Sequence, residues 1–176
     1  MNFLTSGTHL LDGPAGTIEV LVDVPKTSVL TGRALIAHPQ PLLGGSAQHK
    51  GQHFLSRALV EREWITVLPN FRGVGRSAGS HDLSGGESED LKWLVDEIRR
   101  SHLGEVPLAL VGVSFGAFVQ AKVAEKHQRE NRPAQYVCLA AMPSGEVEGG
   151  RCYDIPQGIS SAMVVHGELD KCVSVQ

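Results

Sequence analysis

The sequence PLALVGVSFGA, residues 107–117, joins an apolar segment to a helical one through a serine flanked by glycines. Pro107 to Val113 is almost entirely apolar, as expected of a strand that is buried on both faces of a sheet. Phe115 to Arg129 follows at once and has the spacing of a helix. Parallel sheets covered by helices are built from such strand–helix units, so this stretch predicts an α/β fold.

Ser114 lies at the centre of the pattern G-x-S-x-G, residues 112–116. A direct turn from strand to helix leaves no room for side chains at the flanking positions, which explains the glycines. Such a turn projects the serine hydroxyl beyond the carboxyl edge of the sheet, where the helix N-terminus favours negative charge. Ser114 is therefore a candidate nucleophile, and the N–H of Phe115 a candidate oxyanion-hole donor. The alternative is a glycine-rich turn with an incidental serine, and the surrounding strand and helix favour the nucleophile.

A second candidate segment is HPQPLLGG, residues 38–45, which follows the predicted buried strand Arg33–Ala37. Hydrolases with a serine turn of this type take their second oxyanion donor from the loop at this place. Pro39 and Pro41 have no N–H, so Gln40 is the donor that the HPQP run offers. Prolines on both sides would hold that donor still, which suits preorganised electrostatic stabilisation. Alone, the segment could equally be a rigid proline turn; together with the serine turn it predicts an oxyanion loop.

Strands and helices alternate along most of the chain. Five further strands are predicted, at Thr17–Val24, Arg33–Ala37, Trp64–Leu68, Gln135–Ala140 and Ala162–Val165. Two further helices are predicted, one over residues 49–62 with Phe54, Leu55, Ala58 and Leu59 on its apolar face, and one on Leu91, Leu94, Val95 and Ile98. This order predicts a mostly parallel sheet with helices on both faces. No repeat or linker divides the chain, so we expect a single domain over residues 1–176.

The connection over residues 142–160 is rich in glycine, proline and serine and has no helical period. We expect it to be a mobile segment near the site. It leaves little room for a lid, which favours an open site and small soluble substrates over long lipids.

Composition and charge exclude several classes of function. The formal net charge is −3 and no block of lysine or arginine occurs, so neither nucleic acid nor an anionic membrane is an expected partner. No apolar run approaches the ~20 residues that span a bilayer, and no secretory signal is visible, so we expect a cytoplasmic protein. Cys138, Cys152 and Cys172 are too few and too scattered for a disulfide framework or a zinc site. We expect neither a metal nor a cofactor.

Two other patterns are better explained by structure than by function. GVGRSAG, residues 73–79, is close to a dinucleotide fingerprint, but the third glycine comes one residue late and the next helix begins well downstream. We expect Arg72 or Arg76 to pair with a structural carboxylate rather than with substrate. His49 and His53 have the i, i+4 spacing of metal ligands, yet no acidic third ligand follows at a recognisable spacing. An exposed helix face is the favoured interpretation.

Five segments occur in a characteristic order and spacing: HPQPLLGGS, LPNFRGVGRSAGSHD, GESEDLKWL, LVGVSFGA and VVHGELDKCV. From about residue 17 to the end, the chain resembles small bacterial α/β-hydrolases related to dienelactone hydrolases and serine esterases. Their oxyanion loop typically reads HPHP…GG, so Gln40 replaces a histidine, but the expected role uses only its backbone. The resemblance implies an α/β-hydrolase fold and a serine hydrolase that cleaves a small ester, thioester or related acyl substrate through an acyl-enzyme on Ser114.

The resemblance also implies the acid of a catalytic triad. In the family this acid follows the strand that reads VVHG here, which places it at Asp170. A carboxylate at the carboxyl edge of the sheet can orient a histidine and stabilise its imidazolium. Glu168 is a neighbouring carboxylate, but the family register favours Asp170. Without the resemblance, HGELD would be interpreted as an acidic turn at the end of a strand.

The catalytic base is missing from its expected place. The order in this fold is serine, acid, histidine, and the residues after Asp170, Lys171 to Gln176, include no histidine. A further helix and strand with their loops need roughly 25 residues or more. We therefore expect the chain to be C-terminally incomplete and to lack the last strand and helix of the fold. The exposed sheet edge that results would invite self-association.

Three explanations remain open at this point. The chain is a truncated enzyme, a shortened non-catalytic homologue that acts as a binding or interaction module, or a protein whose base comes from a second chain. Among the eight histidines, His166 and His81 are the least implausible substitutes for the base, and neither is favoured. The retained Ser114, Asp170 and oxyanion loop argue mildly against the non-catalytic module.

Overall fold

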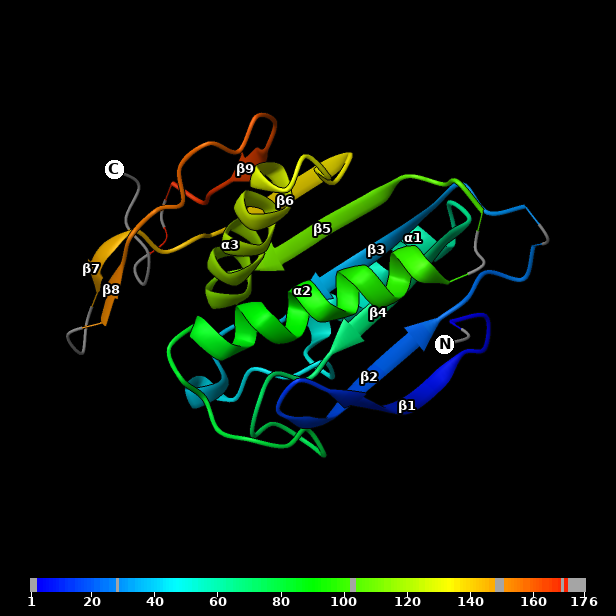
Figure 1. Cartoon of the computed structure of the whole chain (residues 1–176), viewed down its shortest axis with the longest axis horizontal. Helices are drawn as coiled ribbons and strands as arrows, with labels where there is room; N and C mark the ends of the chain where they lie inside the picture. Colours follow the sequence, from blue (N-terminus) through cyan, green and yellow to red (C-terminus); the bar gives the residue numbers. More distant parts are fainter. Residues whose placement is uncertain (1–2, 28, 102–103, 148–150, 169, 171–176) are drawn as a thin grey trace.

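A seven-stranded sheet runs through the protein (Figure 1). The structure is a computed structural model that describes residues 3–27, 29–101, 104–147, 151–168 and 170. The order of the strands across the sheet is β1-β2-β4-β3-β5-β6-β9. These strands are β1 (Gly7–Gly13), β2 (Gly16–Asp23), β3 (Gly32–Ala37), β4 (Trp64–Pro69), β5 (Leu108–Val113), β6 (Tyr136–Ala140) and β9 (Met163–Val165).

Five of the strands form a parallel block, and two are antiparallel. β4, β3, β5, β6 and β9 pair in parallel, whereas β1 and β2 form a hairpin that pairs antiparallel with β4. All six residues of β3 are buried, as the apolar run in the sequence requires. The prediction of a mostly parallel α/β sheet is therefore confirmed.

Helices cover both faces of the sheet. α2 (Gly85–Arg100) and α3 (Phe115–Arg129) lie on the face that is turned to the viewer in Figure 1, and α1 (Lys50–Val60) lies on the other. The predicted apolar face of α2 is buried in the larger core with α3. A smaller core on the other face joins Ile36 and Leu68 of the sheet to Leu55 and Leu59 of α1.

The predicted apolar face of α1 is partly wrong. Phe54 is 74% exposed, while Gln52 and Ser56 are fully buried. Polar contacts explain why α1 turns this polar side, and not Phe54, toward the sheet. The Ser56 hydroxyl lies 2.6 Å from both Asp23 Oδ2 and Thr66 Oγ1. Apolar periodicity cannot anticipate a helix face that is positioned by hydrogen bonds to the sheet.

Three strands were not predicted. In β1 only Leu11 is fully buried and Leu10 is half exposed, so the apolar alternation is weak. The segment predicted to be mobile contains the antiparallel pair β7 (Gly145–Val147) and β8 (Arg151–Tyr153). This pair ends at Tyr153, whose buried ring packs edge-on against Phe118 at 4.9 Å. The connection thus contains a β-pair whose end is packed in the core, and the expected mobility of the rest stays a prediction.

β9 lies at the edge of the sheet within the part of the chain that the structure describes. Its residues Met163, Val164 and Val165 are 57%, 58% and 54% exposed. Lys171 to Gln176 lie outside the described residues. No helix of the described part is long and apolar enough to cross a membrane.

Candidate active site

Ser114 occupies the turn between β5 and α3 in a strained backbone conformation. Its φ is 53° and its ψ is −123°, a region that costs a residue with a side chain about 1–3 kcal/mol. Three backbone hydrogen bonds hold it there. The Ser114 N–H donates to the carbonyl of Ala140 at 2.8 Å, and the Ser114 carbonyl accepts from Ala117 and Phe118 at 2.9 and 3.2 Å. The side chain is partly exposed, as a reactive hydroxyl must be.

The two glycines of the turn are required by close backbone contacts. A Cβ atom at Gly112 would lie 2.4 Å from the carbonyl oxygen of Gly116 and 2.5 Å from the Cα of Ala117. A Cβ atom at Gly116 would lie 2.4 Å from the carbonyl oxygen of His38 and 2.5 Å from that of Ala37. The second contact joins the serine turn directly to the end of β3, so the two predicted site segments touch through their backbones.

Gln40 lies in the loop that follows β3 and is 4% exposed. Its carbonyl accepts the N–H groups of Leu43 and Gly45 at 3.1 and 3.0 Å, which closes the loop into a compact turn. The backbone N–H of Gln40 donates no hydrogen bond to any other described residue. Phe115 is the first residue of α3, and its N–H therefore has no carbonyl one turn earlier to bind. Both proposed oxyanion donors are thus unused and come from touching segments.

His38 anchors this loop from the inside. The side chain is fully buried, Nδ1 donates to the carbonyl of Pro39 at 2.7 Å, and Nε2 accepts the N–H of Phe71 at 3.1 Å. The ring also packs on the ring of Phe71 at 4.4 Å. Burial lowers the pKa of His38 to about 4. Because both ring nitrogens are occupied, His38 is a neutral structural residue.

The loop over residues 70–79 is fixed by ion pairs. The Arg72 guanidinium binds the Asp90 carboxylate through two hydrogen bonds of 2.6 and 3.1 Å. Arg76 binds Glu19 through its side chain and its N–H, both at 2.9 Å, and this N–H is the largest cause that lowers the pKa of Glu19. The prediction that Arg72 or Arg76 pairs with a structural carboxylate is confirmed for both arginines.

His81 is also buried in a structural contact. Its Nδ1 lies 2.6 Å from Glu87 Oε1, and its ring packs edge-on against Phe115 at 5.0 Å. Glu87 caps α2 by accepting the N–H of Ser84 at 2.9 Å, and burial raises the pKa of this carboxyl group. His81 Nε2 is closed off from solvent and has no hydrogen-bond partner among the described residues. Within the described part of the chain, His81 therefore forms no hydrogen bond with the Ser114 hydroxyl.

Asp170 and His166 lie at the same edge of the sheet as Ser114. The register aligns the last residues of β5, β6 and β9, and Val165 accepts the N–H of Ala141 at 2.8 Å. His166 Nε2 and Asp170 Oδ2 are 4.0 Å apart. The Ser114 hydroxyl makes no hydrogen bond within the described residues. The structure therefore brings Ser114, the loop that contains Gln40 and the candidate acid Asp170 to one edge of the sheet, but among the described residues no histidine forms a hydrogen bond with Ser114.

The two histidines with metal-like spacing serve other contacts. His49 is the N-cap of α1 and accepts the N–H of Gly51 at 3.2 Å through Nδ1, while His53 Nε2 lies 3.3 Å from Gln48 Oε1. No group of three potential metal ligands occurs among the residues that the structure describes.

Tyr153 is a site neighbour that sequence reasoning missed. Its hydroxyl lies 3.4 Å from Gln40 Nε2, and its ring packs near Phe115 with centroids 6.5 Å apart. It thus touches side chains of both residues whose N–H groups are the candidate oxyanion donors. The available signal was a single aromatic residue in a segment otherwise rich in glycine, proline and serine.

Comparison with known proteins identifies the family. The family model of the alpha/beta hydrolase fold matches residues 42–157. The chain belongs to the α/β-hydrolase family.

Two solved structures are similar over nearly the whole chain. An alpha-beta serine hydrolase homologue from Coxiella burnetii is 34% identical with a TM-score of 0.82, and the match covers 97% of this chain and 77% of that one.

The second similar structure is a serine hydrolase without lid from Xanthomonas campestris. It is 33% identical with a TM-score of 0.81, and the match covers 96% of this chain and 74% of that one. An uncharacterized protein from Rickettsia prowazekii is 30% identical over 120 residues, which are 68% of this chain and 50% of that protein. This α/β-hydrolase chain therefore corresponds to half of that curated relative and to about three quarters of the two solved structures.

The contact between the serine turn and the β3 loop predicts the effect of adding one methyl group. Gly116→Ala would force a Cβ atom into the carbonyls of Ala37 and His38, and we expect a loss of about 2 kcal/mol or more in the free energy of unfolding. Urea denaturation measures it. Gly51→Ala is the control, because a Cβ atom there meets only ordinary contacts in α1 and should cost nothing. A Gly116→Ala protein as stable as its parent would contradict the close contact.

Two buried histidines predict an acid-sensitive fold. Burial lowers the pKa of His38 and of His127 to about 4, and for His127 the neighbouring Arg99 adds to the effect. Between pH 6.5 and pH 4 the unfolded chain binds a proton at each histidine that the native chain does not bind, so stability falls as the pH falls. We expect a loss of about 2 kcal/mol for each histidine between pH 8 and pH 5.

Urea denaturation across this pH range tests the assignment. His127→Gln should remove about half of the loss between pH 8 and pH 5, because one of the two neutral rings is gone. An unchanged pH dependence in this variant would show that His127 does not titrate as its burial requires.

Proposed function

We propose that the protein is a serine hydrolase that cleaves a small ester, thioester or related acyl compound through an acyl-enzyme on Ser114. The observation that carries this proposal is the strained serine at the strand–helix turn, packed directly against the loop that holds Gln40. A non-glycine residue at positive φ is costly unless its surroundings fix it, and such strain is typical of sites that act on a ligand.

The reaction would use the two unoccupied N–H groups. Ser114 Oγ attacks the acyl carbon, and the carbonyl oxygen becomes an oxyanion between the N–H groups of Phe115 and Gln40. A base removes the proton from Oγ and delivers it to the departing alkoxide or thiolate. Water then attacks the acyl-enzyme with the same base accepting its proton, which releases the acid and restores Ser114.

Asp170 is the proposed partner of that base, and we propose that the base is a histidine outside residues 1–176. Two observations support this assignment: the Ser114 hydroxyl has no base bound to it within the described residues, and the solved relatives are longer than this chain. His81 is a poor substitute because its Nδ1 contacts Glu87 and its Nε2 is closed off from solvent. His166 already lies near Asp170 and is the better substitute of the two.

The substrate is proposed to be small and soluble. Ser114 is partly exposed, and the similar protein from Xanthomonas campestris is described as lacking a lid. Without a lid, little apolar surface would surround a long acyl chain, so short acyl groups fit the site better.

Hydrolysis of p-nitrophenyl acetate tests the proposal. The protein assayed is the full-length product of the gene, including any residues encoded after Gln176. Ser114→Ala should lower kcat/KM by about 10³-fold or more, because it removes the nucleophile. Ser160→Ala is the control, since this exposed hydroxyl contacts only Gln128 and should leave the rate unchanged. Equal rates in the parent and the Ser114→Ala protein would overturn the proposed nucleophile.

Labelling by a fluorophosphonate locates the base. Residues 1–176 alone should label at Ser114 about 10³-fold more slowly than the intact gene product, because the base is missing. Equal labelling rates would place the base inside the chain, and loss of labelling in His166→Gln would then identify it. An intact protein that neither labels nor turns over substrate would favour the alternative, a non-catalytic homologue that keeps the fold as a binding module.

A further inference from the structure

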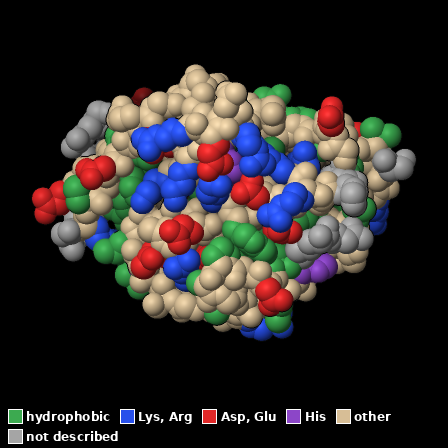
Figure 2. Space-filling view, in the orientation of Figure 1, with side chains coloured by type: hydrophobic (Ala, Val, Ile, Leu, Met, Phe, Trp, Pro, Cys, Tyr) green, Lys and Arg blue, Asp and Glu red, His purple; other side chains and the backbone are tan. Residues whose placement is uncertain are grey.

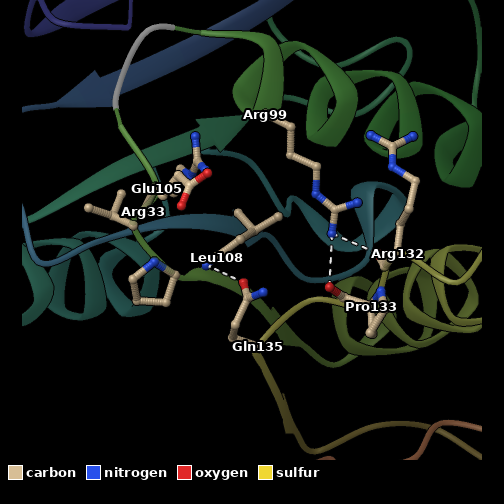
Figure 3. A pocket seen from close by; sticks show the side chains of 9 residues that line it. Arg33, Arg99, Glu105, Leu108, Arg132, Pro133 and Gln135 are labelled. Carbon is tan, nitrogen blue, oxygen red and sulfur yellow. Dashed lines mark hydrogen bonds between the residues drawn. The ribbon is translucent and has the colours of Figure 1, made fainter.

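A pocket lies at the edge of the sheet opposite to the candidate active site at Ser114. It has a volume of about 500 Å³ and is bordered by the ends of α2 and α3 and by the first residues of β3 and β5 (Figure 3). Leu108 on its wall begins β5, and Ser114 follows the end of the same strand. Six extended residues span about 20 Å, so the pocket is separate from the candidate active site.

The pocket is strongly basic. Arg33, Arg99 and Arg132 contribute guanidinium groups to its lining, and Glu105 is its one carboxylate. Figure 3 shows Arg33 and Glu105 on one side of the hollow and Arg99 with Arg132 on the other. Within the described residues neither Arg33 nor Arg99 has an acidic partner at ion-pair distance, whereas Arg132 pairs with Asp96 at 3.2 Å. Among the described residues Arg33 thus has no carboxylate at ion-pair distance, and Arg99 is attracted only at longer range by Asp96 and Glu130.

Burial makes the charges of Arg33 and Arg99 costly. Arg33 is only 8% exposed; its Nη1 donates to the carbonyl of Ile98 at 2.9 Å, but its Nε has no hydrogen-bond partner among the described residues. Desolvation lowers the pKa of Arg33 and of Arg99, and for Arg99 the nearby charge of Arg132 is the next cause. A buried cation that donates only to neutral carbonyls keeps part of its desolvation cost, and an anion in the pocket would relieve that cost.

The hydrogen-bond pattern of the lining favours an acceptor as ligand. Arg99 Nη2 donates to the carbonyls of Arg132 and Pro133 at 2.7 and 3.1 Å, so these acceptors are already used. Gln135 Oε1 accepts the N–H of Leu108 at 2.9 Å, which leaves the amide NH₂ of Gln135 as its remaining polar group. Most of the polar groups that remain are therefore donors.

The surrounding surface would attract the same kind of ligand. Figure 2 shows that lysine and arginine side chains gather over the face formed by α2 and α3, with a few carboxylates among them. Arg99 is in α2, and Arg132 follows α3. A basic surface around a pocket raises the local concentration of anions.

We propose that this pocket binds a small phosphomonoester, with its phosphate held by Arg33, Arg99 and Arg132. A phosphate dianion matches a lining of three arginines and one glutamate better than a carboxylate does, because a carboxylate carries a single charge. Its oxygens suit the forked donors of guanidinium groups. A cavity of about 500 Å³ is also larger than a bare phosphate needs, and Leu108 with two prolines gives it an apolar wall for an organic group.

Calorimetric titration at about pH 8, where phosphate is mainly a dianion, tests the ligand class. We expect saturable binding of inorganic phosphate, tighter binding of phenyl phosphate, and at least about tenfold weaker binding of benzoate. If phenyl phosphate binds no tighter than inorganic phosphate, the pocket is a site for free phosphate, and the proposed organic group of the ligand is wrong. Benzoate that binds as well as phenyl phosphate, or no saturable binding of phosphate, would overturn the proposal.

Two exposed arginines provide a matched pair of variants. Arg132→Gln should weaken binding of phenyl phosphate about tenfold, because a guanidinium bond to the anion is lost. Arg100→Gln is the control: it removes the same charge from the end of α2, but Arg100 pairs with Glu97 and does not line the pocket. Equal weakening by both variants would mean that phosphate responds only to the general charge of the surface.

Glu105→Gln provides a test that does not depend on the arginines. This exposed side chain is the carboxylate of the lining, so its neutralisation should tighten phosphate binding by about threefold or more. Weaker or unchanged binding in this variant would contradict the proposed anion position.

Ser114→Ala should bind phosphate as the parent does, since the two sites lie at opposite ends of β5. The test of the phosphate site is therefore independent of the hydrolase activity.

Discussion

The candidate site depends on a contact between two pieces of backbone. The turn that carries Ser114 approaches the end of β3 so closely that Gly116 has no space for a Cβ atom beside the carbonyls of Ala37 and His38. This approach brings the segments that contain Phe115 and Gln40 together, although the two residues are far apart in the sequence. It also fixes the strained conformation of Ser114, because the turn cannot relax without moving into β3.

Buried polar groups maintain this contact from below. His38 uses both ring nitrogens, one on the carbonyl of Pro39 and one on the N–H of Phe71, and it can do so only while neutral. Phe71 packs against Phe115, so the loop after β3, the loop after β4 and the turn at Ser114 form one packed unit. Acid stability and site geometry are therefore coupled, since protonation of His38 at Nε2 would remove the acceptor that holds Phe71.

The two ends of β5 have opposite chemistry. At the carboxyl end, the helix N-terminus and free N–H groups surround a neutral hydroxyl, which suits a charge that forms only during reaction. At the amino end, three permanent cations and a single carboxylate line a hollow in the described structure, which suits a ligand that is already negatively charged. One strand thus separates a proposed reaction site from a proposed binding site by its full length.

The sequence alone determined the parallel sheet and the strand–helix turn at Ser114; it predicted a structural carboxylate for Arg72 or Arg76 but not which one. Apolar runs, paired glycines and the HPQP segment act over a few residues, so their consequences are local and can be predicted. Only the tertiary structure decided which polar residues turn α1 away from its apolar face, that Tyr153 reaches Gln40, and that Arg33, Arg99 and Arg132 meet in one pocket. These arrangements join residues distant in the chain, and no local periodicity records how distant side chains share hydrogen bonds and burial.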